Sequence, residues 1–422
     1  MRLGAPHFGR AGRDNRQPTS IIEACAGTVG LLIHHSAALL RRIVPVGTVP
    51  DPARVAVLCD GFLRYGCAQA AGLSEIGMNV SLYYVDRLDE FAGNRHDRET
   101  HLDRARDAGV TTVVLPRRRL RSLHRHTLWL HRDLRRRRVA AAVVHAHIDP
   151  RYSTLGLSLP VALMVHDPQL HSGDELSRNS FSVRMMSRFA EMTAACLVIH
   201  SEKLLVQVRP VLRLLPIGVV PHGADMAAMP TPVPVRRRLL VFGRLFEYKG
   251  VDTALDAFCS LPSAISDTEL VVAGRGPLAA SAHGVPNVEV REGYVADADL
   301  EELLATTRLV LLAYKDATQS GVGLQAIARG VPCVVSRTGG LPELVDVGSP
   351  GLVVEPNSPT ELAHAIAEHI DHGEPLRRAT YEHAAANFAW PVVARRICAE
   401  MARMGLAVAS PGDSLKAQVQ ES

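Results

Sequence analysis

The stretch Val241–Leu255, VFGRLFEYKGVDTAL, decides the fold. Its apolar start predicts a buried strand that ends at Gly243, and its second half predicts a helix that begins near Lys249. A glycine at the strand end allows a tight turn. Arg244 offers a planar fork of hydrogen-bond donors, and Lys249 a point charge on a long stem. Two cations at a strand end beside a helix N-terminus predict a diphosphate site; the alternative is a surface ion-pair cluster with neighbouring acids.

Two downstream motifs continue this strand–turn–helix pattern. VVAGRGP predicts a strand and a turn with Gly274 and Gly276, although such a turn alone is a weak signal. GYVADADLEELL predicts a helix start, and we interpret Asp297 and its neighbouring acid as helix caps. The backbone near Tyr294 and Val295 is a candidate wall for a nucleobase.

Apolar runs alternate with helical segments on both sides of the proline-rich stretch 229–238, MPTPVPVRRR. This alternation predicts an α/β protein with two Rossmann-like, doubly wound parallel sheets that face a cleft. We expect a first domain at 51–228, completed by C-terminal helices of 388–422 that cross back to it, and a second domain at 235–387. The three prolines predict a stiff linker between them.

The composition bounds the class of protein. The chain has 422 residues, 47% of them apolar, and a net charge of +4, which disfavours a general nucleic-acid binder. Seven cysteines without a CxxC pair favour free thiols in a reducing compartment, so we expect a cytoplasmic protein. The 19 histidines show no metal-binding spacing, and we expect no metal.

Residues 1–50 predict an N-terminal extension that is partly disordered and carries a helix over Thr19–Val44. The helix is interrupted by polar residues and falls short of a clean apolar span. A packed or loose helix is the simplest interpretation; a membrane-surface helix and a true span remain alternatives. No signal-peptide cleavage site is convincing.

The stretch Arg117–Arg138 contains ten arginines and three histidines but one acid, Asp133. Leucines and Trp129 interleave with the arginines, which predicts a basic amphipathic helix. Three interpretations stay open: a solvated face, a surface for an anionic membrane or a lipid-diphosphate acceptor, and nucleic acid. The last is disfavoured because stacking aromatics do not recur along the run.

The segment Ala317–Val335, ATQSGVGLQAIARGVPCVV, predicts a turn, a short helix and a buried strand, and it contains no acid. Its backbone amides could hold anionic oxygens or sugar hydroxyls. The candidate ligand-binding residues here are Thr318, Gln319, Ser320, Gly321, Val322 and Gln325.

In order and spacing, FGRLFEYKG, AGRGP, GYVADADLEELL and SGVGLQAIARGVPCVVSRTGGLPELV resemble glycosyltransferase family 4, which has the GT-B fold. The first half resembles it more loosely, through VVHAH, VALMVHDP, ACLVIHS and VVPHG. The resemblance covers most of the chain after Val55 and none of the first fifty residues. It implies a retaining, hexosyltransferase-like enzyme that uses a nucleotide-diphosphate sugar, usually without a bound metal.

The resemblance also implies roles for individual residues. Arg244 and Lys249 would hold the donor diphosphate, as their chemistry independently suggests, with Gly243, Gly274 and Gly276 shaping the turns. His166, at the end of a first-domain strand, would contact the donor sugar. His222, in VVPHG, is better interpreted as a structural turn residue. The candidate acceptor-binding residues are Asp60, Tyr65, His171 and Asp174.

One departure from the family pattern concerns its two glutamates. Alignment on AIARG puts Gln325 at the ribose-binding glutamate and Ala317 at the glutamate near the donor sugar. Gln325 can still accept and donate hydrogen bonds, but without charge. Asp316, one residue away, could supply a carboxylate if the turn shifts its register. A degenerate, inactive site is the alternative.

The sequence thus predicts transfer of a sugar from a UDP- or GDP-linked donor to a hydroxyl acceptor. We expect a lipid-linked cell-envelope or exopolysaccharide precursor as acceptor, with the protein at the inner face of the membrane. Three alternatives stay open: a transferase acting on a small metabolite, a nucleotide-sugar epimerase, and a non-catalytic sugar-nucleotide-binding partner.

Overall fold

The computed structural model describes residues 54–87, 89–116, 122–145, 149, 151–166, 181–208, 210–228, 236–345 and 352–406. Several predictions lie outside these residues. They are the N-terminal helix, most of the proline-rich linker, residues 117–121 of the arginine stretch, the candidates His171 and Asp174, and the chain after 406.

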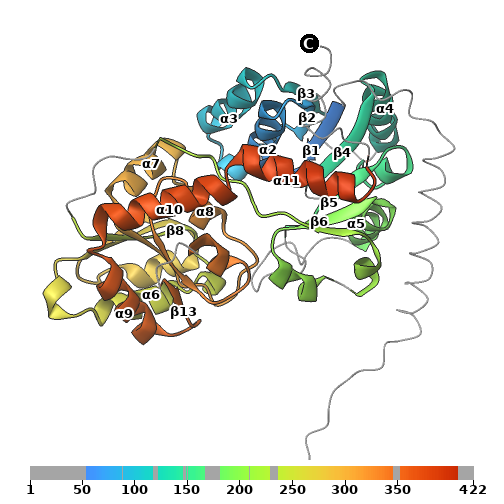
Figure 1. Ribbon diagram of the computed structural model, residues 1–422. Helices are drawn as coiled ribbons and strands as arrows, with labels where there is room; N and C mark the ends of the chain where they lie inside the picture. The colour runs from blue at the N-terminus through green and yellow to red at the C-terminus, as the bar shows by residue number, and fades with distance from the viewer. Residues whose placement is uncertain are drawn as a thin grey trace, which may run out of the picture.

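Two parallel sheets form the protein, one in each half of the chain (Figure 1). The first has the strand order β3-β2-β1-β4-β5-β6-β7. Its strands are β1 (Arg54–Cys59), β2 (Asn79–Val85), β3 (Thr111–Leu115), β4 (Val139–His145), β5 (Val161–Met164), β6 (Cys196–Ile199) and β7 (Ile217–Val219). The helices of this half are α2 (Leu63–Glu75), α3 (Arg95–Asp107), α4 (Leu123–Arg136) and α5 (Phe181–Thr193).

The second sheet has the order β10-β9-β8-β11-β12-β13. Its strands are β8 (Arg238–Arg244), β9 (Glu269–Arg275), β10 (Val288–Glu292), β11 (Leu309–Leu312), β12 (Cys333–Ser336) and β13 (Val353–Val354). Its helices are α6 (Val251–Cys259), α7 (Asp297–Thr306), α8 (Gly321–Ile327), α9 (Pro359–His369) and α10 (Gly373–Asn387). The predicted α/β class with two doubly wound parallel sheets is confirmed.

Both faces of the first sheet are covered, as its apolar strands require. Alternate residues of β1 enter different cores: Val55 and Val57 join one cluster, Ala56 and Leu58 the other. This alternation follows from the two-residue period of a strand. Strand β4 is buried along its whole length, so its end, His145, is also buried.

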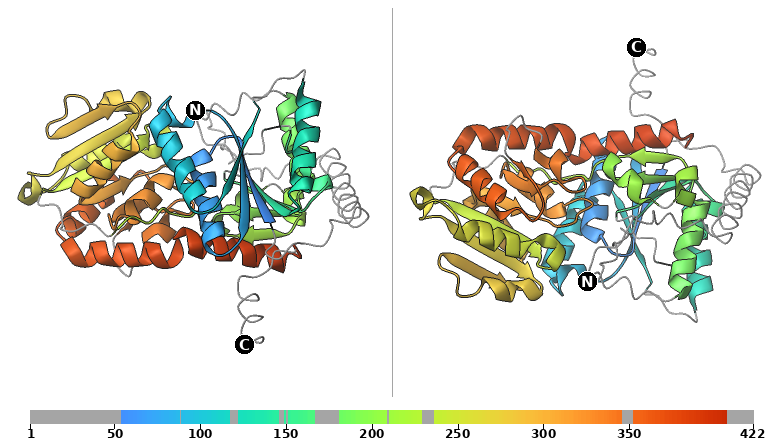
Figure 2. Two further views of the ribbon diagram at one scale, coloured as in Figure 1. Left: turned by 90° about the horizontal axis from the view of Figure 1, so that it is seen from above. Right: turned by 90° about the horizontal axis from the view of Figure 1, so that it is seen from below.

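The last helix, α11 (Trp390–Arg403), leaves the second domain and packs on α2 of the first. Both views in Figure 2 show α10 and α11 end to end across the two domains. Trp390 starts α11 and is 6% exposed. A Cβ on Gly72 would lie 2.7 Å from the Trp390 Cβ, so only a glycine on α2 admits this close approach.

Helix α4 forms from the predicted basic amphipathic stretch. Leu130 and Leu134 are buried against the first sheet, whereas Leu128 and Trp129 are 52% and 40% exposed. Within the described ranges, no helix combines the length and apolar character needed to cross a membrane.

Candidate functional site

Four histidines gather at the C-terminal edge of the first sheet. His145 ends β4, and His166, His200 and His222 follow β5, β6 and β7. Met164 pairs with Val198 in the parallel register, so His166 and His200, each two residues further on, lie side by side. In open parallel sheets this edge is where ligands bind.

The imidazoles form a connected cluster. His166 Nε2 lies 3.0 Å from His145 Nδ1, and His166 Nδ1 lies 3.1 Å from His200 Nε2 and 3.5 Å from His222 Nε2. His145 Nε2 contacts Gln69 Oε1 at 2.7 Å, and His200 Nδ1 contacts a backbone carbonyl, that of Val220, at 3.0 Å. Both ring nitrogens of the candidate catalytic His166 therefore lie against other histidines.

Burial disfavours the charged form of two members of this cluster, His145 and His222. His145 and His200 are fully buried and His166 is 8% exposed. Desolvation, with a smaller effect from His200, lowers the pKa of His145 to about 3. Burial also lowers the pKa of His222 well below its usual range. Neutral imidazoles keep a nitrogen lone pair, which can accept a hydrogen bond or bind a metal.

Two aromatic side chains enclose the cluster. Phe62 stacks on the His166 ring with the centroids 4.5 Å apart. Tyr65 packs edge-on against His166 at 5.1 Å and His222 at 4.9 Å. The candidate acceptor residue Tyr65 therefore packs against the histidine rings, and its contact with an acceptor stays a prediction. Another acceptor candidate, Asp60, is 3% exposed and lies 3.2 Å from an Arg87 nitrogen.

In the second domain, Arg244 ends β8 and Lys249 ends the short 3₁₀ helix η7 (Glu247–Lys249). Arg244 is exposed, whereas Lys249 is 9% exposed. The Lys249 ammonium lies 3.9 Å from the centroid of the Tyr314 ring and hydrogen-bonds the Tyr314 hydroxyl, which lies 2.9 Å from Ser320 Oγ. Burial raises the pKa of Tyr314, so its hydroxyl stays protonated. Lys249 is therefore buried, and its predicted role toward a diphosphate, like the ion-pair alternative, stays a prediction.

All three predicted glycines lie at close approaches that leave no room for a Cβ. Gly243 has a φ of 107°, and a Cβ there would lie 2.9 Å from Val322 Cγ2. Gly274 has a φ of 146°, and a Cβ there would lie 1.9 Å from the Gly243 carbonyl oxygen. The structure thus brings Gly243, Gly274 and Val322 together beside Arg244, and a Cβ on Gly276 would lie 2.3 Å from the carbonyl oxygen of Leu245.

The acid-free turn before α8 reaches across to the first domain. Gln319 Nε2 donates to the His200 carbonyl at 3.2 Å, and Ser201 Oγ donates to Glu343 at 2.5 Å. Ser320 caps α8 by accepting from Gly323 N at 3.1 Å, and Thr318 is buried. Gly321 is exposed at the start of α8. The histidine cluster and this turn therefore lie at one interface.

The remaining members of the turn differ in exposure. Gln325 is half-buried on α8, and Asp316 is exposed just before the buried Ala317. Their roles toward a nucleotide sugar stay predictions.

Helix α7 begins at Asp297 with Asp297 and Asp299 in its first turn, as predicted, but neither side chain caps it. The N-cap residue of α7 is Ala296, without a side-chain cap. Asp297 instead pairs with Arg64 and with His101 Nε2 at 2.9 Å, both in the first domain. Burial by itself raises the pKa of Asp297. The hydrogen bond from His101 and the charge of Arg64 outweigh this effect, so the pKa is lowered. The acid joins the domains.

The Tyr294 side chain belongs to the same interdomain contact. Its hydroxyl donates to Asp97 Oδ2 at 2.8 Å and accepts from Arg64 at 3.1 Å. Val295 packs partly buried against the second core. The nucleobase wall predicted here from the backbone stays a prediction.

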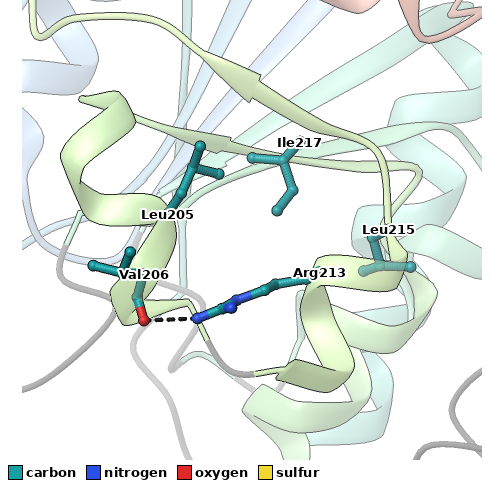
Figure 3. Close-up of a pocket in the computed structure, with 5 residues that line it drawn as sticks. All are labelled: Leu205, Val206, Arg213, Leu215 and Ile217. Atoms are coloured by element: carbon teal, nitrogen blue, oxygen red, sulfur yellow. Dashed lines mark hydrogen bonds between the residues drawn. The ribbon is translucent and has the colours of Figure 1, made fainter.

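A hollow of about 410 Å³ lies elsewhere on the first domain (Figure 3). It is lined by Leu205, Val206, Arg213, Leu215 and Ile217. Ile217 starts β7, whereas His222 follows its end, so this hollow is at the other edge of the sheet from the histidines. It is therefore separate from the candidate site.

Comparison with known proteins agrees with this geometry. Residues 236–372 match the family model described as "Glycosyl transferases group 1". The sucrose-phosphate synthase of Thermosynechococcus elongatus superposes with a TM-score of 0.62 at 16% identity, covering 84% of this chain and 100% of that one. Anabaena Alr3699/HepE, solved in complex with UDP-glucose, gives 0.61 at 16% identity over 83% and 99%. The fold is GT-B-like.

Sequence relatives match over shorter stretches. The GDP-mannose-dependent alpha-(1-6)-phosphatidylinositol dimannoside mannosyltransferase of Mycobacterium tuberculosis is 32% identical over 178 residues, 41% of this chain and 46% of that protein. The N-acetyl-alpha-D-glucosaminyl L-malate synthase of Bacillus anthracis is 30% identical over 149 residues, 32% and 38% of the two chains. This chain therefore matches less than half the length of these relatives.

Proposed function

We propose that this GT-B-like protein is a glycosyltransferase that moves a sugar from a UDP- or GDP-linked donor to a hydroxyl acceptor. The observation that carries the proposal is the pair Arg244 and Lys249 at the carboxyl edge of the second sheet. Lys249 is buried with its ammonium against a tyrosine hydroxyl and ring, shortly after a strand end, which supports a role for its positive charge in holding the donor diphosphate. The match to group 1 glycosyl transferases over this same domain supports it.

In the proposed reaction the donor diphosphate lies against Arg244 and Lys249, which stabilise the charge that grows on the leaving group. This step needs no metal, since the two side chains supply the positive charge. The acceptor hydroxyl attacks from the face that the diphosphate leaves, and a diphosphate oxygen takes its proton. The anomeric configuration is then retained. His166 Nδ1 would exchange its contacts with His200 and His222 for a hydrogen bond to a hydroxyl of the donor sugar.

The test is release of nucleoside diphosphate from UDP- and GDP-sugars, with and without candidate acceptors, followed by NMR of the product anomer. We expect acceptor-dependent release and a retained linkage. Release without an acceptor would instead indicate hydrolysis or isomerisation. Binding of the donor without release of nucleoside diphosphate would favour the non-catalytic partner. The absence of glutamates at positions 317 and 325 is the observation that motivates this alternative. An inverted linkage would contradict the retaining mechanism.

For the acceptor we propose a lipid-linked precursor at an anionic membrane. The support is the outer face of α4, where exposed Leu128 and Trp129 lie between exposed Arg125 and Arg132. Apolar residues flanked by arginines are typical of helices that lie in a membrane surface. The phosphatidylinositol dimannoside named in the M. tuberculosis relative is a lipid of this kind.

This surface predicts co-sedimentation with phosphatidylglycerol vesicles that weakens as salt rises. The double variant Leu128→Ser/Trp129→Ser should bind at least about tenfold more weakly, because two apolar side chains no longer enter the interface. Val206→Ser is the matched control, since Val206 is 75% exposed away from α4. Equal binding of both variants, or none by the wild type at low salt, would contradict the assignment.

A further inference from the structure

The histidine cluster has a geometry that the proposed transfer does not require. His166, His200 and His222 each offer one ring nitrogen, and these three atoms lie within 4.8 Å of one another. Two of the separations are 3.1 and 3.5 Å. Ligands of a tetrahedral Zn²⁺, with Zn–N bonds of about 2.0–2.1 Å, stand roughly 3.3–3.4 Å apart. The two pairs that share His166 already have nearly this spacing, and the third pair lies within 4.8 Å.

The hydrogen-bond partners of His200 and His166 leave the lone pairs of their neutral rings on the two nitrogens that face each other. His200 donates from Nδ1 to the Val220 carbonyl, which leaves the lone pair of the neutral ring on Nε2. With Gln69 Oε1 facing it, His145 donates from Nε2 and accepts at Nδ1 from His166 Nε2. The lone pair of neutral His166 is then on Nδ1. Hydrogen bonds of this kind, from the other ring nitrogen to a carbonyl, are typical of metal-ligating histidines.

We propose that His166 Nδ1, His200 Nε2 and His222 Nε2 bind a divalent first-row transition metal of the Zn²⁺ class. Imidazole ligands suit such ions, and the three protein ligands leave a fourth position for water or another small ligand. His222 is partly buried but is the most exposed of the three ligands, so it gives the site its side toward solvent. Among the residues that the structure describes, this is the one group of three or more His, Cys, Asp or Glu side chains that could hold a metal ion.

The metal site and the proposed transfer share one atom. A metal on His166 Nδ1 excludes a donor-sugar hydroxyl from the same lone pair, so the two ligands should compete. This consequence rests on the proposed function, whereas the metal site itself does not. The two can fail separately, because metal binding is measured without any sugar donor.

The test titrates the full-length, chelator-treated protein with Co²⁺, followed by Zn²⁺ competition against a chromophoric chelator. We expect the intense visible absorption of tetrahedral Co²⁺, displaced by Zn²⁺. His222→Asn should weaken Zn²⁺ binding at least about 100-fold, because loss of even an outer-shell partner costs about 10–100-fold. His283→Asn is the control: His283 is exposed, outside the cluster and paired with Glu292.

A second variant tests the orienting role of the outer shell. His145→Leu removes the acceptor for His166 Nε2, and it should weaken Zn²⁺ binding by about 10–100-fold while keeping the tetrahedral Co²⁺ spectrum. Circular dichroism of each variant verifies folding, and His222→Gln replaces His222→Asn if the latter unfolds. If the wild type binds no Co²⁺, or if the His222 and His283 variants bind alike, the proposal is wrong. In that case the Gln69 amide would present its NH₂ group to His145 Nε2, and the histidines would be connected by hydrogen bonds only.

Discussion

Replacing Lys249 by methionine should lower the kcat/KM of the proposed transfer by about 10²–10³-fold, the usual effect of removing one preorganised group that stabilises transition-state charge. Methionine keeps an unbranched apolar stem against the Tyr314 ring but removes the ammonium that lies 3.9 Å from the ring centroid. The measurement is steady-state release of nucleoside diphosphate with the donor and acceptor identified for the wild type.

Folding should hardly respond to the same change. The loss of the ammonium's contacts is offset by removal of the desolvation cost of a buried charge. The free energy of unfolding should therefore change by less than about 1 kcal/mol, and Tyr314 keeps its hydrogen bond to Ser320. Lys315→Met is the control, since Lys315 pairs with Asp252 at 2.6 Å. Equal activity of the Lys249 and Lys315 variants would contradict the proposal that Lys249 holds the donor diphosphate.

The fold class and the cation pair could be predicted because both depend on local signals. Buried parallel strands appear as apolar runs, and Gly243, Arg244 and Lys249 follow one such run directly. The burial of Lys249 was not predictable, because Tyr314 comes from a different strand end, 65 residues further along the chain.

The histidine cluster could be predicted only in part. The motif predicts a functional role for His166, whereas no local signal distinguishes His145 and His200. The turn interpretation of His222 does not predict its place in the cluster. Each follows a different strand, and only the parallel register of β4 to β7 brings the four rings together. All four lie at the end of a strand or within three residues after it, so the polar residues around each strand end are the signal that predicts them.

Helix α3 was missed for a related reason. RHDRETHLDRARD is polar almost throughout, so it lacks the apolar periodicity that indicates a helix. The helix forms because Leu102 and Ala105 are buried and Asn94 caps its start by accepting from two backbone amides. Its Asp97 and His101 then contact Tyr294 and Asp297 of the second domain, partners almost 200 residues away that no local pattern indicates.

Replacing Trp390 by alanine should destabilise the first domain by about 3–5 kcal/mol, the usual cost of truncating a buried aromatic side chain. Gly72 and Gly223 leave room for this ring: a Cβ on Gly223 would lie 2.4 Å from the nearest Trp390 ring atoms. Tyr65, which packs on the histidines, contacts the same ring edge-on at 4.8 Å. Removing the indole leaves a cavity between α11, α2 and the histidine cluster. The measurement is urea unfolding followed by circular dichroism.

The chain contains a matched control, since its two tryptophans are Trp129 and Trp390. Trp129 is 40% exposed on α4, so Trp129→Ala should change the free energy of unfolding by less than about 0.5 kcal/mol. That variant also leaves Trp390 as the sole tryptophan, so its fluorescence reports the undocking of α11 during unfolding. If α11 holds the first domain together, the fluorescence and circular dichroism transitions of Trp129→Ala should coincide. An early fluorescence transition, or equal urea midpoints for the two alanine variants, would show that α11 only rests on a domain that is stable without it.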